Sequence, residues 1–309
     1  MSVTIILGYN GGGKTTLTKK LFPNHARLNR DEIGGKLKNL PQHLVKLLTK
    51  DTMTDVVLDN TYADVESRSG VIDVCTQFGV RCDCIWLDTS IEDAQVNACQ
   101  RMIQKYGHVL SPEESKKSKD PNAFPIAALY SYRKRFQKPT VAEGFSSVEK
   151  VKFVRERGPE YKNKSLLLDY DGTLRESTGP TPWPEHTDHV KLLPGRKEKL
   201  QEYVDNGYIL LGVSNQSAIA KGTLSVETAK ACFDRTNELL EFDIPYKFCP
   251  HKVPPISCYC RKPGPQSGVE YIEEYKLDPA QCIMVGDMTS DKTFAKRCGF
   301  QYQDQGVFF

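Results

Sequence analysis

Short apolar runs that end at a polar position recur along this chain, and stretches of helical periodicity separate them. The runs have the length of buried strands, and they cover residues 3–8, 56–58, 82–87, 165–168, 208–213 and 282–285. Amphipathic helical patterns follow at residues 15–21 and about 91–106. Because strands that alternate with helices form parallel sheets covered on both faces, the pattern predicts an α/β fold in each half.

The length of the chain, 309 residues, suits two domains of ordinary size. A short charged stretch that begins at Arg155 interrupts the pattern halfway. We therefore expect a first domain over residues 1–155, a linker over 156–162 and a second domain over 163–309. Residues 111–125 are rich in Lys, Ser and Pro, and this composition predicts a mobile loop.

Composition narrows the setting. No apolar run approaches the roughly 20 residues of a membrane span, and the first residues lack the basic segment of a signal peptide. We therefore expect an intracellular protein whose ten cysteines are reduced or bind metal. Residues 1–155 carry 23 Lys and Arg against 17 Asp and Glu, whereas residues 156–309 carry 19 against 22. A basic first half suits a polyanionic substrate, although ordinary scatter would also explain this difference.

The apolar run at 3–8 leads into a glycine-rich loop, Gly8-Tyr9-Asn10-Gly11-Gly12-Gly13-Lys14-Thr15. Such a loop presents backbone N–H groups to phosphate at the start of a helix. Lys14 is expected to reach the β- and γ-phosphates, and the Thr15 hydroxyl is expected to bind Mg²⁺. The pattern thus predicts an ATP site made by Gly8, Gly11, Gly12, Gly13, Lys14, Thr15 and Thr16. The alternative is a chance glycine turn.

Two charged residues are candidates for the rest of this site. Asp31 follows the first helix and could accept the proton of an acceptor hydroxyl, although an aspartate near a helix start is often an N-cap. Arg101 lies on the predicted helix before the polar loop and could bind phosphate from a lid. Exposed arginines are also often merely solvated.

Together, several segments of the first half resemble the kinase domain of polynucleotide kinase 3′-phosphatases, over about residues 1–153. They are Gly8–Thr15, Asn29-Arg30-Asp31, Asp59-Asn60-Thr61 with Arg68, and residues 131–136 and 139–145. The resemblance implies a P-loop fold in which Asp31 activates a 5′-hydroxyl and Lys14 and Thr15 hold ATP and Mg²⁺. It also implies that Thr61 and Arg68 lie near the acceptor, and it makes Arg101 the candidate lid arginine.

An acidic pair, Asp169-Tyr170-Asp171, follows the apolar run at 165–168. Residues two apart on a strand share a face, so both carboxyl groups can meet one phosphate. One can attack phosphorus while the other protonates the leaving oxygen. Two carboxylates repel a phosphate dianion, and a divalent cation bound by Asp169, Asp171 and Asp287 would compensate.

The second half resembles the haloacid dehalogenase superfamily of phosphatases, over about residues 163–309. The matching motifs are Asp169-x-Asp171-Gly172-Thr173, Ser214, Lys262, and Gly286-Asp287 with Asp291. The resemblance implies a Rossmann-like α/β domain in which Ser214 binds phosphate and Lys262 neutralises the phosphoaspartate.

Within this superfamily, residues 214–222 and 258–263 look like the histidinol-phosphate and heptose-bisphosphate phosphatases, and they make Asn215 a candidate substrate ligand. Those enzymes carry a zinc loop. Tyr170 and Met288 stand where that subgroup usually has arginine and lysine.

A zinc site can also be inferred from the residues themselves. Cys249-Pro250-His251 precedes Cys258-Tyr259-Cys260, and three thiolates with one imidazole are a common structural zinc set. We expect Cys249, His251, Cys258 and Cys260 to be the ligands of one Zn²⁺. The alternative is a loop of reduced, unligated cysteines.

The combination of the two sites predicts an enzyme that heals nucleic-acid ends. It would use ATP and Mg²⁺ to phosphorylate a 5′-hydroxyl and would remove a 3′-phosphate, leaving DNA or RNA ends for a ligase partner. One alternative is a metabolic kinase–phosphatase that acts on a sugar or nucleoside. Another is a nucleotide-dependent scaffold without activity.

Overall fold

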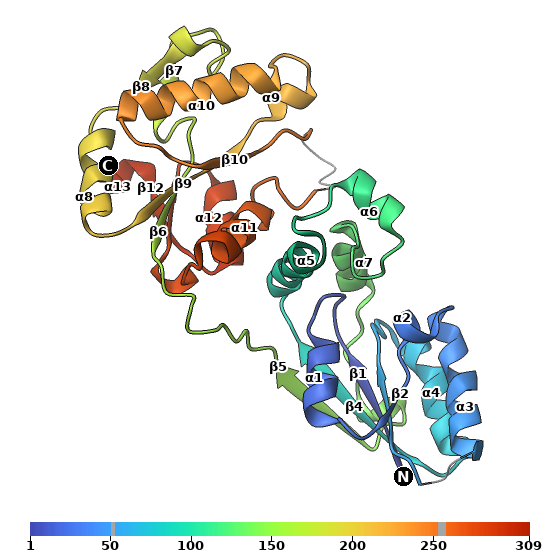
Figure 1. Ribbon diagram of the computed structural model, residues 1–309. Coiled ribbons are helices and arrows are strands. Elements are labelled where there is room, and N and C mark those ends of the chain that lie inside the picture. Colours follow the sequence, from blue (N-terminus) through green and yellow to red (C-terminus); the bar gives the residue numbers. More distant parts are fainter. Residues whose placement is uncertain (51–52, 253–257) are drawn as a thin grey trace. The chain divides into compact units, whose positions relative to one another are not determined.

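The structure is a computed structural model that describes residues 1–50, 53–252 and 258–309. Its chain forms two compact units (Figure 1). Residues 1–98 and 115–155 make up the first unit, and residues 99–114 and 156–309 make up the second. The domain limits expected from the sequence stay a prediction, since the end of one long helix is grouped with the second unit. Within the described ranges, no helix has the length and apolar character needed to cross a membrane.

The first unit is built on a five-stranded sheet in the order β2-β3-β1-β4-β5. The strands are β1 (Ser2–Leu7), β2 (Ala26–Arg27), β3 (Val56–Asp59), β4 (Arg81–Asp88) and β5 (Ser147–Lys152). All neighbours are parallel, with Val3 opposite Val56 on one side and Cys82 on the other. The helices that connect them are α1 (Lys14–Leu21), α2 (Arg30–Ile33), α3 (Leu40–Lys50), α4 (Val65–Gln77), α5 (Ile91–Tyr106), α6 (Pro112–Ser118) and α7 (Ala127–Arg135).

Successive residues of the central strand β1 point to opposite faces of the sheet, as strand geometry requires. Ile5 belongs to a core shared with α3 and α4, where Leu44 and Val71 are also buried. Ile6 belongs to a smaller cluster on the other face, against Leu17 of α1. The loops that follow β1 and β3 lie at the carboxyl edge of the sheet (Figure 1).

The loop expected over residues 111–125 contains the helix α6, so this expectation was wrong in part. The reason is a local cap. The Ser111 hydroxyl accepts the N–H of Glu114 at 3.2 Å, and the Glu114 carboxylate accepts the N–H of Ser111 at 2.7 Å. This reciprocal pair is a capping box, and Pro112 fits the first helical position.

The second unit repeats the plan with five parallel strands in the order β10-β9-β6-β11-β12. They are β6 (Ser165–Leu168), β9 (Ile209–Asn215), β10 (Tyr246–Cys249), β11 (Ile283–Gly286) and β12 (Gln301–Asp304). A hairpin of β7 (Arg175–Ser177) and β8 (Val190–Leu192) lies outside this sheet. The helices are α8 (Arg196–Asp205), α9 (Ser217–Ala220), α10 (Val226–Leu240), α11 (Gln266–Tyr275), α12 (Thr289–Cys298) and α13 (Gln305–Phe308).

Strand β6 also alternates between two cores. Leu166 and Leu168 pack with Phe233 of α10, whereas Leu167 packs with Tyr271 of α11 on the opposite face. The α/β fold expected for each half is therefore confirmed.

Candidate active sites

The glycine-rich loop joins β1 to α1, and its shape depends on its glycines. Gly11 and Gly13 have φ of 68° and 92°, and a Cβ on Gly12 would lie 2.8 Å from the Tyr9 carbonyl oxygen. Two side chains fix the loop from outside: the Thr89 hydroxyl donates to Gly12 O and the Asn97 amide to Gly11 O, both at 2.7 Å. These two contacts fix the carbonyl oxygens of Gly11 and Gly12.

Arg155 supports this arrangement from the end of the first unit. Its guanidinium donates to the Asn97 side-chain oxygen and, at 3.2 Å, to the Asp93 carboxylate. Asn97 is therefore fixed at both ends of its amide, between Arg155 and the loop.

Lys14 is buried, and its ammonium donates to the carbonyl oxygens of Gly8 at 3.0 Å and Tyr9 at 2.7 Å. The lysine side chain therefore lies along the glycine-rich loop, where it is expected to bind phosphate. Thr16, the next-but-one residue, lies on the exposed side of α1.

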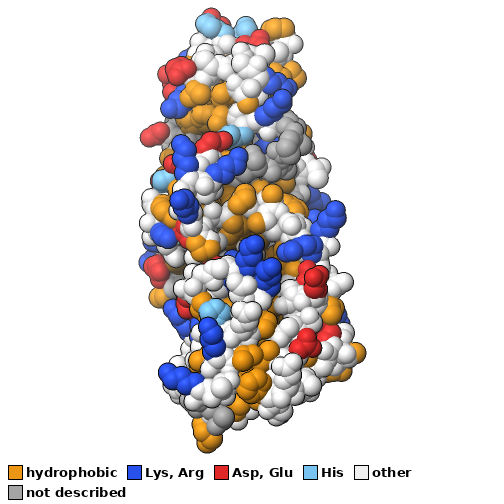
Figure 2. All heavy atoms as spheres, turned by 90° about the vertical axis from the view of Figure 1, so that its right-hand side faces the viewer, with side chains coloured by type: hydrophobic (Ala, Val, Ile, Leu, Met, Phe, Trp, Pro, Cys, Tyr) orange, Lys and Arg blue, Asp and Glu red, His pale blue; other side chains and the backbone are white. Residues whose placement is uncertain are grey.

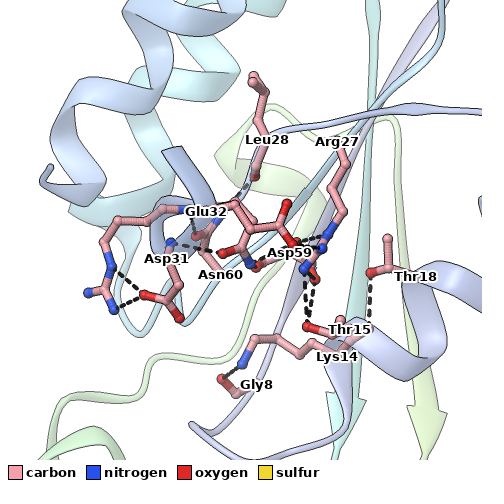
Figure 3. Close-up of polar contacts among 12 residues, drawn as sticks. Gly8, Lys14, Thr15, Thr18, Arg27, Leu28, Asp31, Glu32, Asp59 and Asn60 are labelled. Carbon is pink, nitrogen blue, oxygen red and sulfur yellow. Dashed lines mark hydrogen bonds and ion pairs between the residues drawn. The ribbon is translucent and has the colours of Figure 1, made fainter. Parts of the chain in front are cut away.

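Thr15 lies beside an acidic residue that was not among the predicted site residues. Its hydroxyl donates to Oδ2 of Asp59 at 3.1 Å, and Asp59 ends β3 with 1% of its surface exposed (Figure 3). Neighbouring oxygen ligands of an octahedral Mg²⁺ are about 2.9 Å apart, given Mg–O distances of about 2.0–2.1 Å. Thr15 and Asp59 thus fit a Mg²⁺ site. The signal in the sequence was an acid directly after the buried run at 56–58.

Asp31 lies in the short helix α2, but it does not cap this helix. Asn29 is the N-cap, because its side-chain oxygen accepts the N–H of Asp31 at 2.8 Å. The Asp31 carboxylate is 37% exposed and pairs with Arg30 at 2.6 Å. Asn60 ties α2 to β3, since it accepts the Arg30 N–H at 2.9 Å and donates to Leu28 O at 3.1 Å. Asn29, and not Asp31, is therefore the N-cap of α2. The role of Asp31 as a general base stays a prediction.

Arg68, expected near the acceptor, is a structural residue. It is fully buried, and its guanidinium forms two hydrogen bonds with the Glu143 carboxylate, at 2.7 and 2.9 Å. It also donates to Tyr62 O and Gln137 O. Four of the five N–H groups of the guanidinium are bonded inside the protein, and this argues against the expected contact between Arg68 and substrate.

Two other predicted residues of this half are Thr61 and Arg101. Thr61 follows Asn60 and is partly buried. Arg101 is partly buried in α5. Their roles at the acceptor and in a lid stay predictions.

Basic side chains also lie on the surface of the protein. Arg133, Lys134 and Arg135 are exposed in the last turn of α7, and Figure 2 shows basic side chains on the face it draws.

In the second unit, Asp169 and Asp171 follow β6 and have different surroundings. Asp169 is buried, and Lys262 donates to its Oδ1 at 2.7 Å. Asp171 accepts Nε of Arg175 and Nε2 of Gln216, each at 2.8 Å. Burial raises the pKa of Asp169 to about 7, while Lys262 opposes this shift. The two carboxyl groups therefore differ in burial and in the charged groups that they contact.

Ser214 and Asn215 end β9 next to this pair. Gln216 donates to the Ser214 hydroxyl at 3.0 Å. Asn215 donates to Lys262 O at 3.0 Å and accepts the Lys262 N–H at 2.9 Å. Asn215 thus holds the lysine in place. The sequence analysis did not predict Gln216 or Arg175 as site residues. Gln216 lies within residues 214–222, which resemble the heptose-bisphosphate phosphatases, whereas no motif includes Arg175.

These residues surround a cavity of about 280 Å³. Its lining includes the expected Asp169, Asp171, Ser214, Asn215, Lys262 and Asp287, together with Pro182, Trp183, Gln216, Met288 and Asp291. The predicted residues of the second half are therefore brought together around one space. Tyr170 is instead fully buried in the core, where its hydroxyl donates to Asn237 at 3.0 Å.

The carboxylates that can hold a metal differ from the expected set. Oxygen atoms of Asp169, Asp287 and Asp291 lie within 4.8 Å of one another. The Asp171 side chain is directed instead to Arg175 and Gln216. A Cβ at Gly172 would lie 2.5 Å from Asp287 Oδ2, so glycine leaves room for this cluster. Burial and then Asp291 raise the pKa of Asp287, and a Mg²⁺ ion would relieve this repulsion.

The four predicted zinc ligands also converge, with their ligand atoms within 4.8 Å of one another. The sulfurs of Cys249 and Cys258 are 3.8 Å apart, and Nδ1 of His251 lies 3.4 Å from Cys249 Sγ and 3.1 Å from Cys260 Sγ. Tetrahedral Zn²⁺ with Zn–S bonds of about 2.3 Å places two sulfurs about 3.8 Å apart. All three cysteines are free thiols. The geometry therefore fits zinc.

Comparison with known proteins agrees with this picture. A family model described as an AAA domain matches residues 3–139, and one described as HAD-hydrolase-like matches residues 259–302. A probable D-glycero-D-manno-heptose-1,7-bisphosphate 7-phosphatase of Thermoplasma volcanium is 34% identical over 139 residues, which cover 43% of this chain and 92% of the relative. A bifunctional polynucleotide phosphatase/kinase of Schizosaccharomyces pombe is 31% identical over 173 residues, which cover 55% of this chain and 36% of the relative.

Among solved structures, the Pnkp1/Rnl/Hen1 RNA repair complex contains a chain that covers 98% of this one, with 95% of its own length, at 15% identity and a TM-score of 0.32. The two family models and the two relatives bear out the resemblances inferred from the motifs of both halves. The chain therefore belongs, through its second half, to the haloacid dehalogenase-like phosphatase family, to which it joins an AAA-type P-loop kinase domain, and it is similar to a bifunctional polynucleotide phosphatase/kinase.

Proposed function

We propose that this chain is a bifunctional enzyme that heals nucleic-acid ends. Residues 1–155 form the 5′-hydroxyl kinase, residues 156–162 the linker, and residues 163–309 the 3′-phosphatase. The observation that carries the proposal is that one chain holds both a phosphate-binding loop with a metal-binding oxygen pair and an aspartate cavity with a lysine. The products, a 5′-phosphate and a 3′-hydroxyl, are the ends that a ligase partner joins.

In the kinase, the loop N–H groups and Lys14 bind the phosphates of ATP. Thr15 and Asp59 would hold Mg²⁺, which would neutralise the charge of the phosphoryl group in transfer. Asp31 takes the proton of the 5′-hydroxyl as the new O–P bond forms and the bond to ADP breaks. The carboxylate is exposed enough to meet a polynucleotide end.

In the phosphatase, an Asp169 oxygen attacks phosphorus while Asp171 gives its proton to the leaving 3′-oxygen. Asp171 then takes a proton from the water that hydrolyses the aspartyl-phosphate, so both residues return to their starting state. Lys262 contacts Asp169 directly and lowers the negative charge there. Asp169, Asp287 and Asp291 would hold Mg²⁺, whose charge would balance that of the phosphate.

The second candidate substrate is a sugar bisphosphate, which the similarity to heptose-bisphosphate phosphatases favours. The cavity argues for a nucleic-acid end instead. Among its described lining residues, Lys262 is the sole cation, and it already binds Asp169 and Asp291. A second phosphate of a small sugar would therefore lack a counter-charge. Pro182, Trp183 and Met288 offer an apolar wall that suits the sugar and base of a terminal nucleotide.

The deciding experiment incubates the protein with radiolabelled ATP and Mg²⁺ and with matched 5′-hydroxyl, 3′-phosphate DNA and RNA oligonucleotides. Heptose-1,7-bisphosphate serves as the competing phosphatase substrate. We expect label at the 5′ end and loss of the 3′-phosphate, with kcat/KM at least about 10²-fold above that for the sugar. Preference for the sugar, or no labelled oligonucleotide, would contradict the proposal.

A further inference from the structure

Arg27, which belongs to no recognised motif, lies beside Thr15 and Asp59, the two residues that fit a Mg²⁺ site (Figure 3). It lies in β2, and its guanidinium donates to both oxygens of Asp59, from Nε at 2.8 Å and from Nη2 at 2.7 Å. The same Nη2 also donates to the Thr15 hydroxyl, at 3.1 Å. Arg27 therefore binds the two groups, Thr15 and Asp59, that fit the metal.

This contact answers an electrostatic need. Asp59 is buried and ends a strand, and an unpaired charge there would be costly. Asn29 donates to Asp59 Oδ1 at 3.0 Å but brings no charge. The guanidinium thus supplies the positive charge that a divalent cation would supply in the loaded enzyme.

The guanidinium and a metal cannot use these oxygens together. Mg²⁺ requires its ligands at about 2.0–2.1 Å and carries further ligands around them. The nitrogen Nη2 already lies within 3.1 Å of both the Thr15 oxygen and Asp59 Oδ2. Arg27 has a second partner, since Nη1 pairs with Glu32, whose carboxylate is 59% exposed. It can therefore leave Asp59 without losing every counter-charge.

We propose that Arg27 is the resident cation of the Thr15–Asp59 site and that it is exchanged for Mg²⁺ when the metal–nucleotide enters. The guanidinium then turns toward Glu32 on α2. Because Glu32 follows Asp31, this exchange links nucleotide loading to the helix that carries the proposed base. The inference rests on the proposed function of the loop as a site for ATP and Mg²⁺.

The exchange has a thermodynamic signature. Metal-free ATP benefits from Arg27, which offsets the charge of Asp59, whereas ATP with Mg²⁺ has to displace it. Without Arg27, metal-free ATP meets an unpaired carboxylate and should bind more weakly. The factor by which Mg²⁺ strengthens ATP binding should therefore rise when Arg27 is removed.

The test is calorimetric titration with a non-hydrolysable ATP analogue, once in EDTA and once in Mg²⁺, for the 309-residue wild-type chain and for Arg27→Ala. We expect the Mg²⁺ enhancement to rise at least about ten-fold in the variant, as loss of one charge near bound phosphates implies. Arg27→Lys, which keeps the charge but not the fork, should give an intermediate value. Arg81→Ala is the matched control, because Arg81 forms an exposed pair with Asp83 at the start of β4.

A second readout is the electron paramagnetic resonance signal of Mn²⁺ titrated into the nucleotide-free protein. Arg27→Ala should bind Mn²⁺ more tightly than the wild type, and Arg27→Lys covers the case in which alanine prevents folding. Equal weakening of ATP binding with and without metal would overturn the exchange, since it would make Arg27 a direct phosphate ligand. An unchanged enhancement factor would also overturn it. Failure of the wild type to bind ATP in either condition would instead contradict the proposed function.

Discussion

The ammonium of Lys262 lies 2.7 Å from Asp169 and 2.7 Å from Asp291, so one buried lysine serves two carboxylates of the phosphatase cavity. It also donates to Val213 O at 2.8 Å, and its position is thereby fixed in three directions. Burial raises the pKa of Asp169, and Lys262 counteracts part of this rise, which favours the ionised form of the proposed nucleophile. The chemistry of the cavity should therefore depend on Asp169 alone for attack on phosphorus.

Asp169→Asn should abolish phosphatase activity while leaving the kinase intact. The amide is nearly isosteric but cannot form the aspartyl-phosphate, and the loss should exceed about 10³-fold. The measurement is release of inorganic phosphate from a 3′-phosphate oligonucleotide. Lys14→Ala is the reciprocal variant and should lose only the kinase. Loss of both activities in either folded variant would refute independent sites.

Asp31→Asn should lower the kinase rate by at least about 10²-fold, because the amide cannot accept the hydroxyl proton. ATP affinity should hardly change, since Asp31 acts on the acceptor. Single-turnover transfer from radiolabelled ATP measures the rate. Asn29→Ala is a useful comparison, because Asn29 caps α2 and holds Asp59. Wild-type turnover of Asp31→Asn would end the proposal of a base.

Cys260→Ser should lower phosphatase activity and zinc content together and leave the kinase unchanged. Cys249, another of the expected zinc ligands, pairs with Asn215 across β10 and β9, and its carbonyl accepts the Gln216 N–H at 2.8 Å. Cys260 also lies two residues before Lys262. A loosened metal site should therefore disturb the groups that hold Asp169 and Asp171. Elemental analysis should find about one zinc per wild-type chain. A zinc-free protein with full phosphatase activity would exclude this link.

Arg68→Ala should destabilise the first unit without a specific effect on acceptor binding. Removal of one partner of a buried ion pair costs about 3–5 kcal/mol, because Glu143 would be left without its counter-charge. Trp86 fluorescence in a Trp183→Phe background reports unfolding of that unit, since the chain has two tryptophans. The exposed Arg81 provides the control, and Arg81→Ala should change stability little. Unchanged stability with a raised KM for oligonucleotides would restore the substrate role.

Trp183→Ala should raise the phosphatase KM for a 3′-phosphate oligonucleotide by about ten-fold, as expected for one lost base–aromatic contact. Trp183→Phe should keep most of the affinity. The informative comparison is an oligonucleotide of the same length whose terminal nucleotide lacks a base. Its KM should be insensitive to Trp183→Ala. An equal effect on both oligonucleotides would show that Trp183 acts on the fold of the cavity wall.

The sequence could predict the phosphatase site well because its residues stand at the ends of parallel strands or in spaced pairs. Asp169 and Asp287 directly follow β6 and β11, Ser214 lies near the end of β9, and strand ends of a parallel sheet meet at one edge. The cysteine and histidine pairs were equally visible. Such patterns are local, because each can be recognised within one short segment before the fold brings the segments together.

Contacts between distant segments could not be predicted in this way. Arg27 and Asp59 are 32 residues apart, and Arg68 and Glu143 are 75 apart. Neither sequence segment indicates the partner or the depth of burial. A buried arginine in a helix therefore looked like a surface arginine near substrate, and an acid after a strand looked like any strand end. The capping box at Ser111 was readable, but the polar composition around it obscured the helix.

The contacts of Arg155 matter for how the kinase half can be separated from the rest of the chain. This residue is the last of the first unit, and through Asn97 it reaches the carbonyl of Gly11 in the phosphate-binding loop. A fragment that ends between Lys152 and Arg155 would keep all five strands of the first sheet but lose the contact between Arg155 and Asn97. Its ATP site should be looser than that of a fragment ending after Arg155, so the choice of cleavage point is itself a test of how the loop keeps its shape.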